Sequence, residues 1–362
     1  MTQRWPEWLQ INDNLRDLSP YGAPQIDSPV RLNTNENPYN LDPTLQASIV
    51  AAISENVSHL NRYPDRDAIA LREELALFIN ESSGTTLNSA NVWAANGSNE
   101  ILQSIALAFK GSAMGFEPSY SMHPLISRAV GKSWISVPRS TDFSIDLPSA
   151  LMKISESKPG IIFITTPNNP TGGSVDLEDI KTIAGKAREV SALLVVDEAY
   201  AEFSSAPSAV TLINDHPNIL VSRTMSKAFA FAGARLGYLI AQPAVIDAML
   251  LIRLPYHLSD LTQAAALAAL KERTRLRQDV EQIKVARDGV AAELRALGLN
   301  VLHSDANFLL FTGFTKSAQE MWSSLVDKGV LIRDVGIPGH LRVTIGTTVE
   351  NRAFVSALSS IL

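Results

Sequence analysis

The sequence predicts an α/β protein in which a mostly parallel sheet is covered by helices and a smaller α+β unit follows. Three observations favour this fold. Short apolar runs typical of buried strands alternate with amphipathic helical segments, as in strand–helix–strand proteins. A long, charged helical segment comes next, and residues 299–362 then alternate between short strands and helices. The 362 residues are enough for one large domain and a smaller one.

The composition excludes several classes of function. It is that of a soluble globular protein, with 46% hydrophobic and 19% charged residues. The net charge of −6 argues against nucleic acid as a partner, because nucleic-acid binders usually carry a basic face. The absence of cysteine excludes disulfides, thiolate nucleophiles and cysteine metal sites. No apolar signal region opens the chain and no run approaches the ~18 apolar residues of a membrane span, so we expect a cytoplasmic protein that binds no membrane.

The first 39 residues are expected to be irregular. Prolines at positions 6, 20, 24 and 29 argue against regular structure in residues 1–30 and favour an arm lying over another surface. Residues 31–39 are too polar for a core, and their asparagines and proline are also typical of a turn-rich connector. The pattern over residues 68–79 then predicts a helix with one apolar face.

A strand-to-helix turn is predicted at residues 93–100, followed by a helix whose apolar face begins at Ile101. Gly97 permits close backbone approach, and Ser98 or Asn99 is expected at the N-cap, with free backbone N–H groups pointing out of the helix end. Such an end can bind an anion, although every capped helix offers the same groups.

Buried strands are predicted next, at residues 160–165, 192–196 and 219–221, with a helix over residues 177–190. In a parallel sheet, ligands gather at the carboxyl ends of the strands. Each predicted strand is followed by a polar cluster, at residues 166–172, 197–200 and 222–227. We therefore expect the three clusters to converge on one edge of the sheet and form a site.

The pattern changes after residue 240. Helices are predicted over residues 243–254 and 259–297, and the second is long enough to connect two domains. Short strands are predicted near residues 307–312, 330–333 and 341–345, with helices between and after them. The sequence shows no internal repeat and no low-complexity segment.

Lys227 is the first candidate catalytic residue. It lies between two apolar runs, with the hydroxyls of Thr224 and Ser226 just upstream and Arg235 downstream. A desolvated amine can form a Schiff base with an aldehyde cofactor, and the hydroxyls and guanidinium can bind a phosphate on that cofactor. On this segment alone, a surface lysine in a loop between strands is an equal alternative.

The other clusters fit parts of a pyridoxal phosphate site. Asp197 can keep the pyridine nitrogen of that cofactor protonated, which lets the ring act as an electron sink. Asn169 and Tyr200 can hydrogen-bond the ring oxygen, and Tyr120 can stack on the ring. The alternatives are a helix N-cap for Asp197 and a core or surface position for Tyr120. The histidines show no metal-binding spacing, so no metal site is expected.

Four motifs resemble the fold type I aminotransferases: residues 168–172 (Asn-Asn-Pro-Thr-Gly), 197–200 (Asp-Glu-Ala-Tyr), 226–229 (Ser-Lys-Ala-Phe) and 233–237 (Gly-Ala-Arg-Leu-Gly). Four more are similar to the histidinol-phosphate aminotransferase family, at residues 32–39, 62–65, 97–100 and 342–346. The resemblance covers nearly the whole chain. It implies a sheet of the seven-stranded type with helices on both faces. It also implies an arm with part of the small domain (1–44), a large cofactor-binding domain (45–255), and a long helix with the small domain (256–362).

The resemblance implies pyridoxal 5'-phosphate as cofactor and Lys227 as the Schiff-base lysine and later the acid/base. Asp197 would pair with the pyridine nitrogen, and Asn169 and Tyr200 with the ring oxygen. The phosphate would be bound by Ser98, Asn99, Thr224, Ser226 and Arg235, while Tyr120 stacks on the ring. Tyr63 is expected to reach the phosphate in a neighbouring subunit, which implies a homodimer with shared active sites.

The same resemblance implies transamination of L-histidinol phosphate with 2-oxoglutarate, in histidine biosynthesis. The substrate residues it implies are Tyr21, Asn35, Glu36, Asn37, Arg333 and Arg342. An aromatic amino acid aminotransferase, with Tyr256 lining the pocket, and a phosphothreonine decarboxylase-like enzyme are alternatives. An effector-sensing module would need a fused basic DNA-binding segment, which the short arm does not supply. His123 replaces an aromatic residue of many relatives, and we expect a structural histidine more than one that tunes the pocket.

Overall fold

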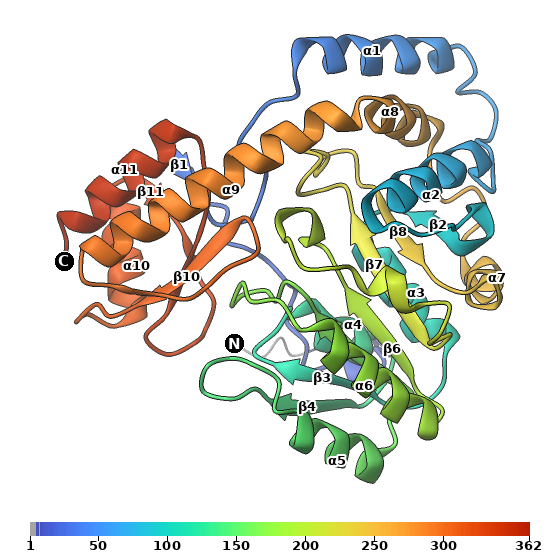
Figure 1. Ribbon diagram of the computed structural model, residues 1–362, viewed down its shortest axis with the longest axis horizontal. Coiled ribbons are helices and arrows are strands. Elements are labelled where there is room, and N and C mark those ends of the chain that lie inside the picture. The colour runs from blue at the N-terminus through green and yellow to red at the C-terminus, as the bar shows by residue number, and fades with distance from the viewer. Residues whose placement is uncertain (1–4, 7) are drawn as a thin grey trace.

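The computed structural model describes residues 5–6 and 8–362, which form a large sheet and a smaller sheet connected by a long helix (Figure 1). The large sheet has seven strands. Their order is β2 (Val92–Ala95), β8 (Gly237–Ile240), β7 (Ile219–Thr224), β6 (Leu193–Asp197), β5 (Ile161–Thr165), β3 (Ala113–Glu117) and β4 (Trp134–Pro138). Only β8 runs antiparallel to its neighbours. The predicted mostly parallel sheet is confirmed.

Helices cover both faces of this sheet, because successive side chains of a buried strand point to opposite faces and both sets here are apolar. Val195 and Leu220 pack in the core beneath α3 (Ser98–Ala108), α4 (Met122–Ala129) and α7 (Pro243–Ile252). Leu194 and Val221 point the other way. The helices on that second face are α2 (Ile69–Ser83), α5 (Leu147–Ser157) and α6 (Leu177–Glu189).

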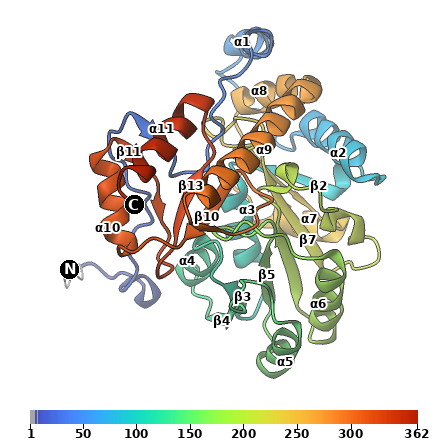
Figure 2. The ribbon, with the colours of Figure 1, turned by 60° about the vertical axis from the view of Figure 1, so that its left-hand side comes forward.

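The second sheet is antiparallel and has four strands. Their order is β12 (Arg333–Asp334), β13 (Leu341–Thr344), β10 (Phe308–Thr312) and β9 (Asn300–Val301). The helices around it are α9 (Arg273–Ala296), α10 (Ala318–Asp327) and α11 (Thr348–Ser359) (Figure 2). The single strand predicted near residues 330–333 is two short strands, β11 (Val330–Leu331) and β12.

The N-terminal arm is irregular apart from a 3₁₀ turn, η1 (Asp13–Leu15), and the short strand β1 (Val30–Arg31). Asn14 donates to the backbone carbonyls at the end of α4, at 2.8 and 3.1 Å, so the arm lies over the large sheet's helices as predicted. β1 pairs in parallel with β11, so the arm residues that follow β1 lie beside the small sheet. Residues 1–4 and 7 of the predicted arm lie outside the described residues.

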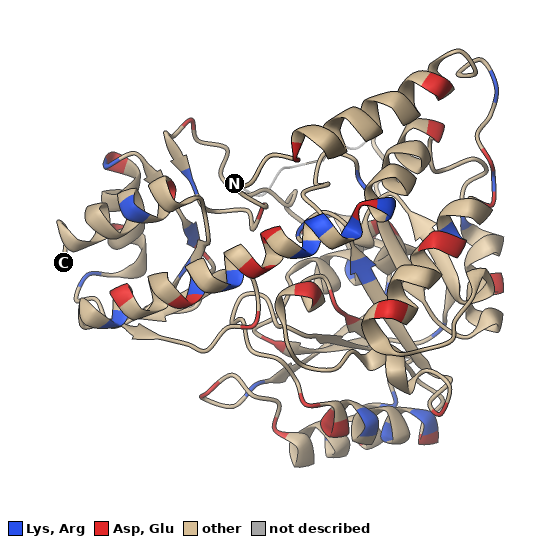
Figure 3. Cartoon of the chain, turned by 45° about the horizontal axis from the view of Figure 1, so that its top comes forward, with Lys and Arg blue, Asp and Glu red and all other residues tan. Residues whose placement is uncertain are grey.

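The predicted long helix over residues 259–297 is wrong in one respect: it is two helices, α8 (Asp260–Lys271) and α9, that break at Glu272. α8 packs along α1 (Pro43–Val57) and α2, whereas α9 leaves for the small sheet (Figure 1). Arg273 forms ion pairs with Glu74 and Glu81 of α2 and donates to the Leu270 carbonyl, which holds the chain at the break. Charged residues of both signs follow along α9 (Figure 3).

Three further 3₁₀ turns complete the described chain: η2 (Ser89–Asn91), η3 (Ala201–Phe203) and η4 (Ala209–Leu212). No helix of the described residues combines the length and the apolar character needed to cross a membrane.

Candidate active site

A cavity of about 870 Å³ lies where the carboxyl ends of β5, β6 and β7 face the arm and the small sheet. The three polar clusters that follow these strands all contribute to its wall. The sequence-predicted residues that line it are Tyr21, Asn35, Glu36, Ser98, Asn99, Tyr120, Asn169, Asp197, Tyr200, Thr224, Ser226, Lys227, Arg235, Arg333 and Arg342. Three predicted residues do not line it: Asn37, Tyr63 and Tyr256.

Lys227 is held by a hydrogen bond from its Nζ to the backbone carbonyl of Thr34, at 3.0 Å. Burial, helped by the guanidinium of Arg342 and opposed by the charge of Glu36, lowers the pKa of Lys227 to about 8. A neutral amine is a nucleophile, whereas an ammonium is not. The lysine is therefore prepared for attack on an aldehyde at a pH where an exposed lysine is almost fully charged.

An anion-binding cradle lies at the start of α3. The N-cap is Gly97 and not Ser98 or Asn99 as predicted, because the backbone has φ of 84° there, which favours glycine. A Cβ on Gly97 would lie 2.7 Å from Nη2 of Arg235, so this guanidinium sits directly over the helix end. The Ser226 hydroxyl is 3.5 Å from Nη1 of Arg235 and accepts from Thr224 at 3.0 Å. Backbone N–H groups, a hydroxyl pair and a guanidinium together fit a phosphate group.

Asp197 is the last residue of β6 and is buried. Its Oδ2 lies 3.1 Å from Nε2 of His123, and in the described part of the chain no donor reaches its Oδ1. A buried carboxylate oxygen without a hydrogen-bond partner destabilises the fold, so we expect a ligand to supply a donor to this atom. The protonated nitrogen of a pyridine ring is such a donor, and the residues present fit pyridoxal phosphate.

The sequence favoured a structural histidine at position 123, but it did not predict that this side chain contacts Asp197. Its ring stacks on Phe163, with centroids 4.7 Å apart, and meets Tyr120 edge-on at 5.5 Å. It lies against Asp197 and does not line the cavity. The available signal was its place one turn after Tyr120, whose carbonyl accepts from the backbone N–H of His123.

Tyr200 is buried in the cavity wall, and burial raises the pKa of its hydroxyl. The hydroxyl accepts from Nδ2 of Asn35 at 2.9 Å and, over a longer distance of 3.5 Å, from Nδ2 of Asn169. Oδ1 of Asn169 accepts in turn from Nη1 of Arg342, at 2.6 Å. Tyr120, on the other side, donates to Oδ1 of Asn99 at 3.1 Å.

Two arginines of the small sheet face the cavity from neighbouring strands, since Arg333 of β12 and Arg342 of β13 are register partners. Arg342 donates to the Asn33 carbonyl at 2.9 Å and lies over the Phe308 ring at 5.1 Å. Burial lowers the pKa of Arg342 to about 10. Among the described residues, Nε of Arg342 and Nη1 of Arg333 are buried without a partner, so the pair can bind an acidic group.

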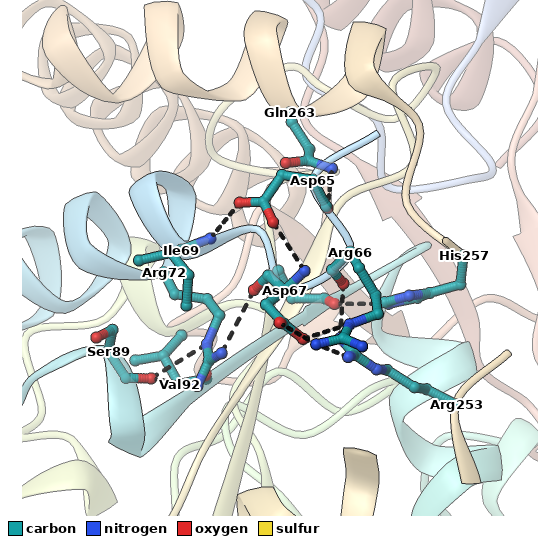
Figure 4. Close-up of polar contacts among 11 residues, drawn as sticks. Asp65, Arg66, Asp67, Ile69, Arg72, Ser89, Val92, Arg253, His257 and Gln263 are labelled. Carbon is teal, nitrogen blue, oxygen red and sulfur yellow. Dashed lines mark hydrogen bonds and ion pairs between the residues drawn. The ribbon is translucent and has the colours of Figure 1, made fainter. Parts of the chain in front are cut away.

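Tyr63 and Tyr256 lie away from this cavity and against each other, with ring centroids 4.3 Å apart. Both are exposed, Tyr63 by 78%. Their loops are connected by a polar network in which Asp67 binds Arg66 and Arg253 (Figure 4). These two arginines lower the pKa of Asp67 to about 2. The network joins the chain segments that carry the two exposed tyrosines.

The remaining predicted residues have simple surroundings. Tyr21 is exposed at the mouth of the cavity, and Glu36 accepts from the Thr34 hydroxyl. Asn37 donates to the Ala228 carbonyl at 3.2 Å and accepts from the Tyr39 backbone, which gives it a structural place. Within the described residues, no group of three or more His, Asp or Glu side chains is arranged to hold a metal ion.

The family described as aminotransferase class I and II matches residues 27–358 of the chain. A histidinol-phosphate aminotransferase from Mycolicibacterium smegmatis is 54% identical over 353 residues, covering 96% of this chain and 92% of that protein. One from Streptomyces avermitilis is 54% identical over 354 residues, covering 97% and 96%. A crystal structure of histidinol-phosphate aminotransferase from Sinorhizobium meliloti in complex with pyridoxal-5'-phosphate has a TM-score of 0.85 at 25% identity and covers 97% of each chain. Aspartate aminotransferase from Thermus thermophilus with maleate, at 22% identity and a TM-score of 0.80, shares the fold.

Proposed function

Because this chain belongs to the aminotransferase class I and II family, we propose that it transfers the amino group of L-histidinol phosphate to 2-oxoglutarate with pyridoxal 5'-phosphate as cofactor. The products are imidazole-acetol phosphate and glutamate, in histidine biosynthesis. The single observation that carries the chemistry is the arrangement of an amine with a lowered pKa, an unpartnered buried carboxylate oxygen and an anion cradle around one cavity. Since the substrates are metabolites, we also place the enzyme in the cytoplasm.

Each residue then has a proposed task. The cofactor, when bound, withdraws electrons from the substrate carbon that loses a proton. Asp197 holds the proton of the pyridine nitrogen through Oδ1, and His123 holds the other carboxylate oxygen in place. Lys227 binds the cofactor, and its Nζ then takes a proton from the substrate carbon and returns it to the cofactor carbon. The cradle residues bind the phosphate, while Asn169, Tyr200 and Tyr120 orient the ring.

The substrate choice rests on Arg333 and Arg342. Histidinol phosphate carries a phosphate and no carboxylate, whereas 2-oxoglutarate carries carboxylates. Each guanidinium has a buried nitrogen without a partner among the described residues, so the pair can bind the phosphate in one half-reaction and a carboxylate in the other. The aromatic amino acid alternative expects Tyr256 in the pocket, and Tyr256 does not line the cavity of its own chain.

Single-turnover kinetics test this substrate. The bound cofactor's absorbance would be followed after mixing with histidinol phosphate, phenylalanine or phosphothreonine, with analysis of the products. We expect the fastest amino transfer from histidinol phosphate, without loss of carbon dioxide. Faster transfer from phenylalanine, or decarboxylation of phosphothreonine, would favour one of the alternatives.

The active site is proposed to be shared across a homodimer. The support is the exposed, stacked pair of Tyr63 and Tyr256, which does not reach the cavity of its own chain. If Tyr63 completes the partner's phosphate site, mixing Lys227→Ala with Tyr63→Ala subunits restores part of the activity, because one site of each heterodimer regains both groups. If both single variants are inactive and exchanged mixtures stay inactive, the shared site is refuted.

A further inference from the structure

Three consecutive arm residues each contact a different group of the site. The Asn33 carbonyl accepts from Arg342 at 2.9 Å, and the Thr34 carbonyl accepts from Lys227 at 3.0 Å. Asn35 instead uses its side chain, whose Nδ2 donates to the Tyr200 hydroxyl at 2.9 Å. Only this third contact can be changed by substitution without altering the backbone.

The direction of the hydrogen bonds around Asn35 is fixed by a short chain of donors. The backbone N–H of Asn35 donates to Oγ1 of Thr344 at 3.0 Å. The Thr344 hydroxyl hydrogen points back and is donated to Oδ1 of Asn35, at 2.9 Å. With its carbonyl oxygen bound, the Asn35 amide presents Nδ2 to Tyr200. A phenol has one hydrogen, and since Tyr200 accepts from Asn35 and, at 3.5 Å, from Asn169, that hydrogen is free to point into the cavity.

The backbone holds Asn35 in this orientation. Its φ is 55°, in the left-handed region where asparagine is among the few side chains readily tolerated. It is only 2% exposed, and its own carbonyl accepts from Asn307 at 3.2 Å. Thr344, Asn307 and the arm strand all belong to the small sheet's side of the molecule. The side chain is therefore held as a donor. Four hydrogen bonds with described residues offset the free energy that the left-handed backbone costs.

We propose that Asn35 is a positioning residue, which makes the Tyr200 hydroxyl donate its hydrogen to the ring oxygen of the cofactor, and that Thr344 orients Asn35 for this task. The assignment deepens the proposed function and rests on it, because it requires the cofactor in this cavity. It also gives Asn35 a role distinct from the direct substrate contact that the family resemblance implied.

The test is the pH at which the visible absorbance of the bound cofactor changes. A hydrogen bond donated to the ring oxygen favours its ionised form and lowers that transition. Tyr200→Phe is the reference, because it removes the donor. Asn35→Asp keeps the size, the left-handed conformation and the acceptor for Thr344, but offers Tyr200 only acceptors, so the phenol hydrogen turns away from the cofactor. We expect Asn35→Asp to raise the transition by about one pH unit, in the direction of Tyr200→Phe.

A double-mutant cycle separates this effect from the added charge. Asn35→Asp should shift the transition strongly with Tyr200 present and hardly at all in the Tyr200→Phe background. Equal shifts in both backgrounds, or none in either, would overturn the assignment.

Two matched substitutions at Thr344 test the same chain of hydrogen bonds from its other end. They replace the Asn35→Asp experiment if that variant does not fold. Thr344→Val, which lacks the hydroxyl, should raise the transition, whereas Thr344→Ser should leave it in place. Two identical responses from the pair would contradict the role of the hydroxyl. Wild-type protein that fails to bind the cofactor would refute the proposed function itself, whereas normal binding with unshifted variants would refute only the role of Asn35.

Discussion

The floor and the mouth of the cavity are built in different ways. On the floor, Asp197 ends a strand of the large sheet, and Lys227 and the start of α3 each follow one, so the backbone aligns them directly. In the mouth, Arg342 is bound to Asn33 across 309 positions of the chain, and Tyr21 comes from the arm. The floor is therefore as rigid as the large sheet, whereas the mouth depends on how the small sheet and the arm pack on it. A fixed cofactor and an adaptable substrate site suit an enzyme that must accept two different substrates in turn.

The two regions also differ in how burial acts on charge. On the floor, burial drives Lys227 towards its neutral form, since its Nζ donates to a backbone carbonyl and forms no ion pair with a carboxylate of the described residues. In the mouth, burial lowers the pKa of Arg342 only to about 10, so it stays charged at neutral pH. Desolvation thus produces a nucleophile in one place and an anion site in the other.

The largest effect is expected on the floor. Lys227→Ala should reduce turnover by at least about 1,000-fold, because one amine both binds the cofactor and moves the proton. Steady-state kinetics would measure it, with circular dichroism as control for the fold. Activity within tenfold of wild type, without added amine, would refute the role of Lys227.

The next prediction concerns the protonation state of Lys227. In cofactor-free protein, labelling of this lysine by an amine-selective reagent should have a midpoint near pH 8, against 10.5 for an ordinary lysine. Below that midpoint the protonated form is unreactive, so the rate falls as the pH falls. The lowered pKa corresponds to about 300-fold more neutral amine at neutral pH. Peptide mass spectrometry would follow the label, with exposed Lys181 as the internal control. Equal labelling midpoints for both lysines would show that burial does not lower the pKa of Lys227.

In the mouth, Arg342→Ala should lower kcat/KM for histidinol phosphate by about 10- to 150-fold, because a charge-assisted hydrogen bond is worth roughly 1.5–3 kcal/mol. The unphosphorylated analogue histidinol should be hardly affected. Arg342→Lys keeps the charge without the planar fork, so its kcat/KM for histidinol phosphate should lie between those of wild type and Arg342→Ala. Equal losses for both alcohols would mean that Arg342 supports the structure and does not bind the phosphate.

The smallest expected effect is at His123, which acts through Asp197. His123→Phe preserves the stacking on Phe163 but removes the partner of Asp197 Oδ2. We expect cofactor affinity to fall by about tenfold, within the range for one lost hydrogen bond to a charged group. Equilibrium dialysis would measure the affinity. His123→Gln retains a donor and should recover part of the loss. Unchanged affinity in both variants would make His123 a packing residue alone.

Elements with strong periodicity were predicted well, and short or covered ones were not. The strands of residues 160–165 and 192–196 lie within one residue of β5 and β6, because buried parallel strands are continuous apolar runs. The break at Glu272 was missed because α8 and α9 share one helical pattern, and only packing against α2 separates them. α1, α4 and α5 were also unassigned.

The sequence by itself determined the floor of the site: the polar residues after each strand end meet because parallel strands bring their carboxyl ends to one edge. Only the tertiary structure decided the rest. The bond between His123 and Asp197, the bond between Asn35 and Tyr200 and the place of Arg342 beside Asn169 join segments far apart in the chain. No local pattern encodes such contacts, because they depend on how the arm and the small sheet pack on the large one. The identity of each residue is written in the sequence, whereas its hydrogen-bond partner is set by that packing.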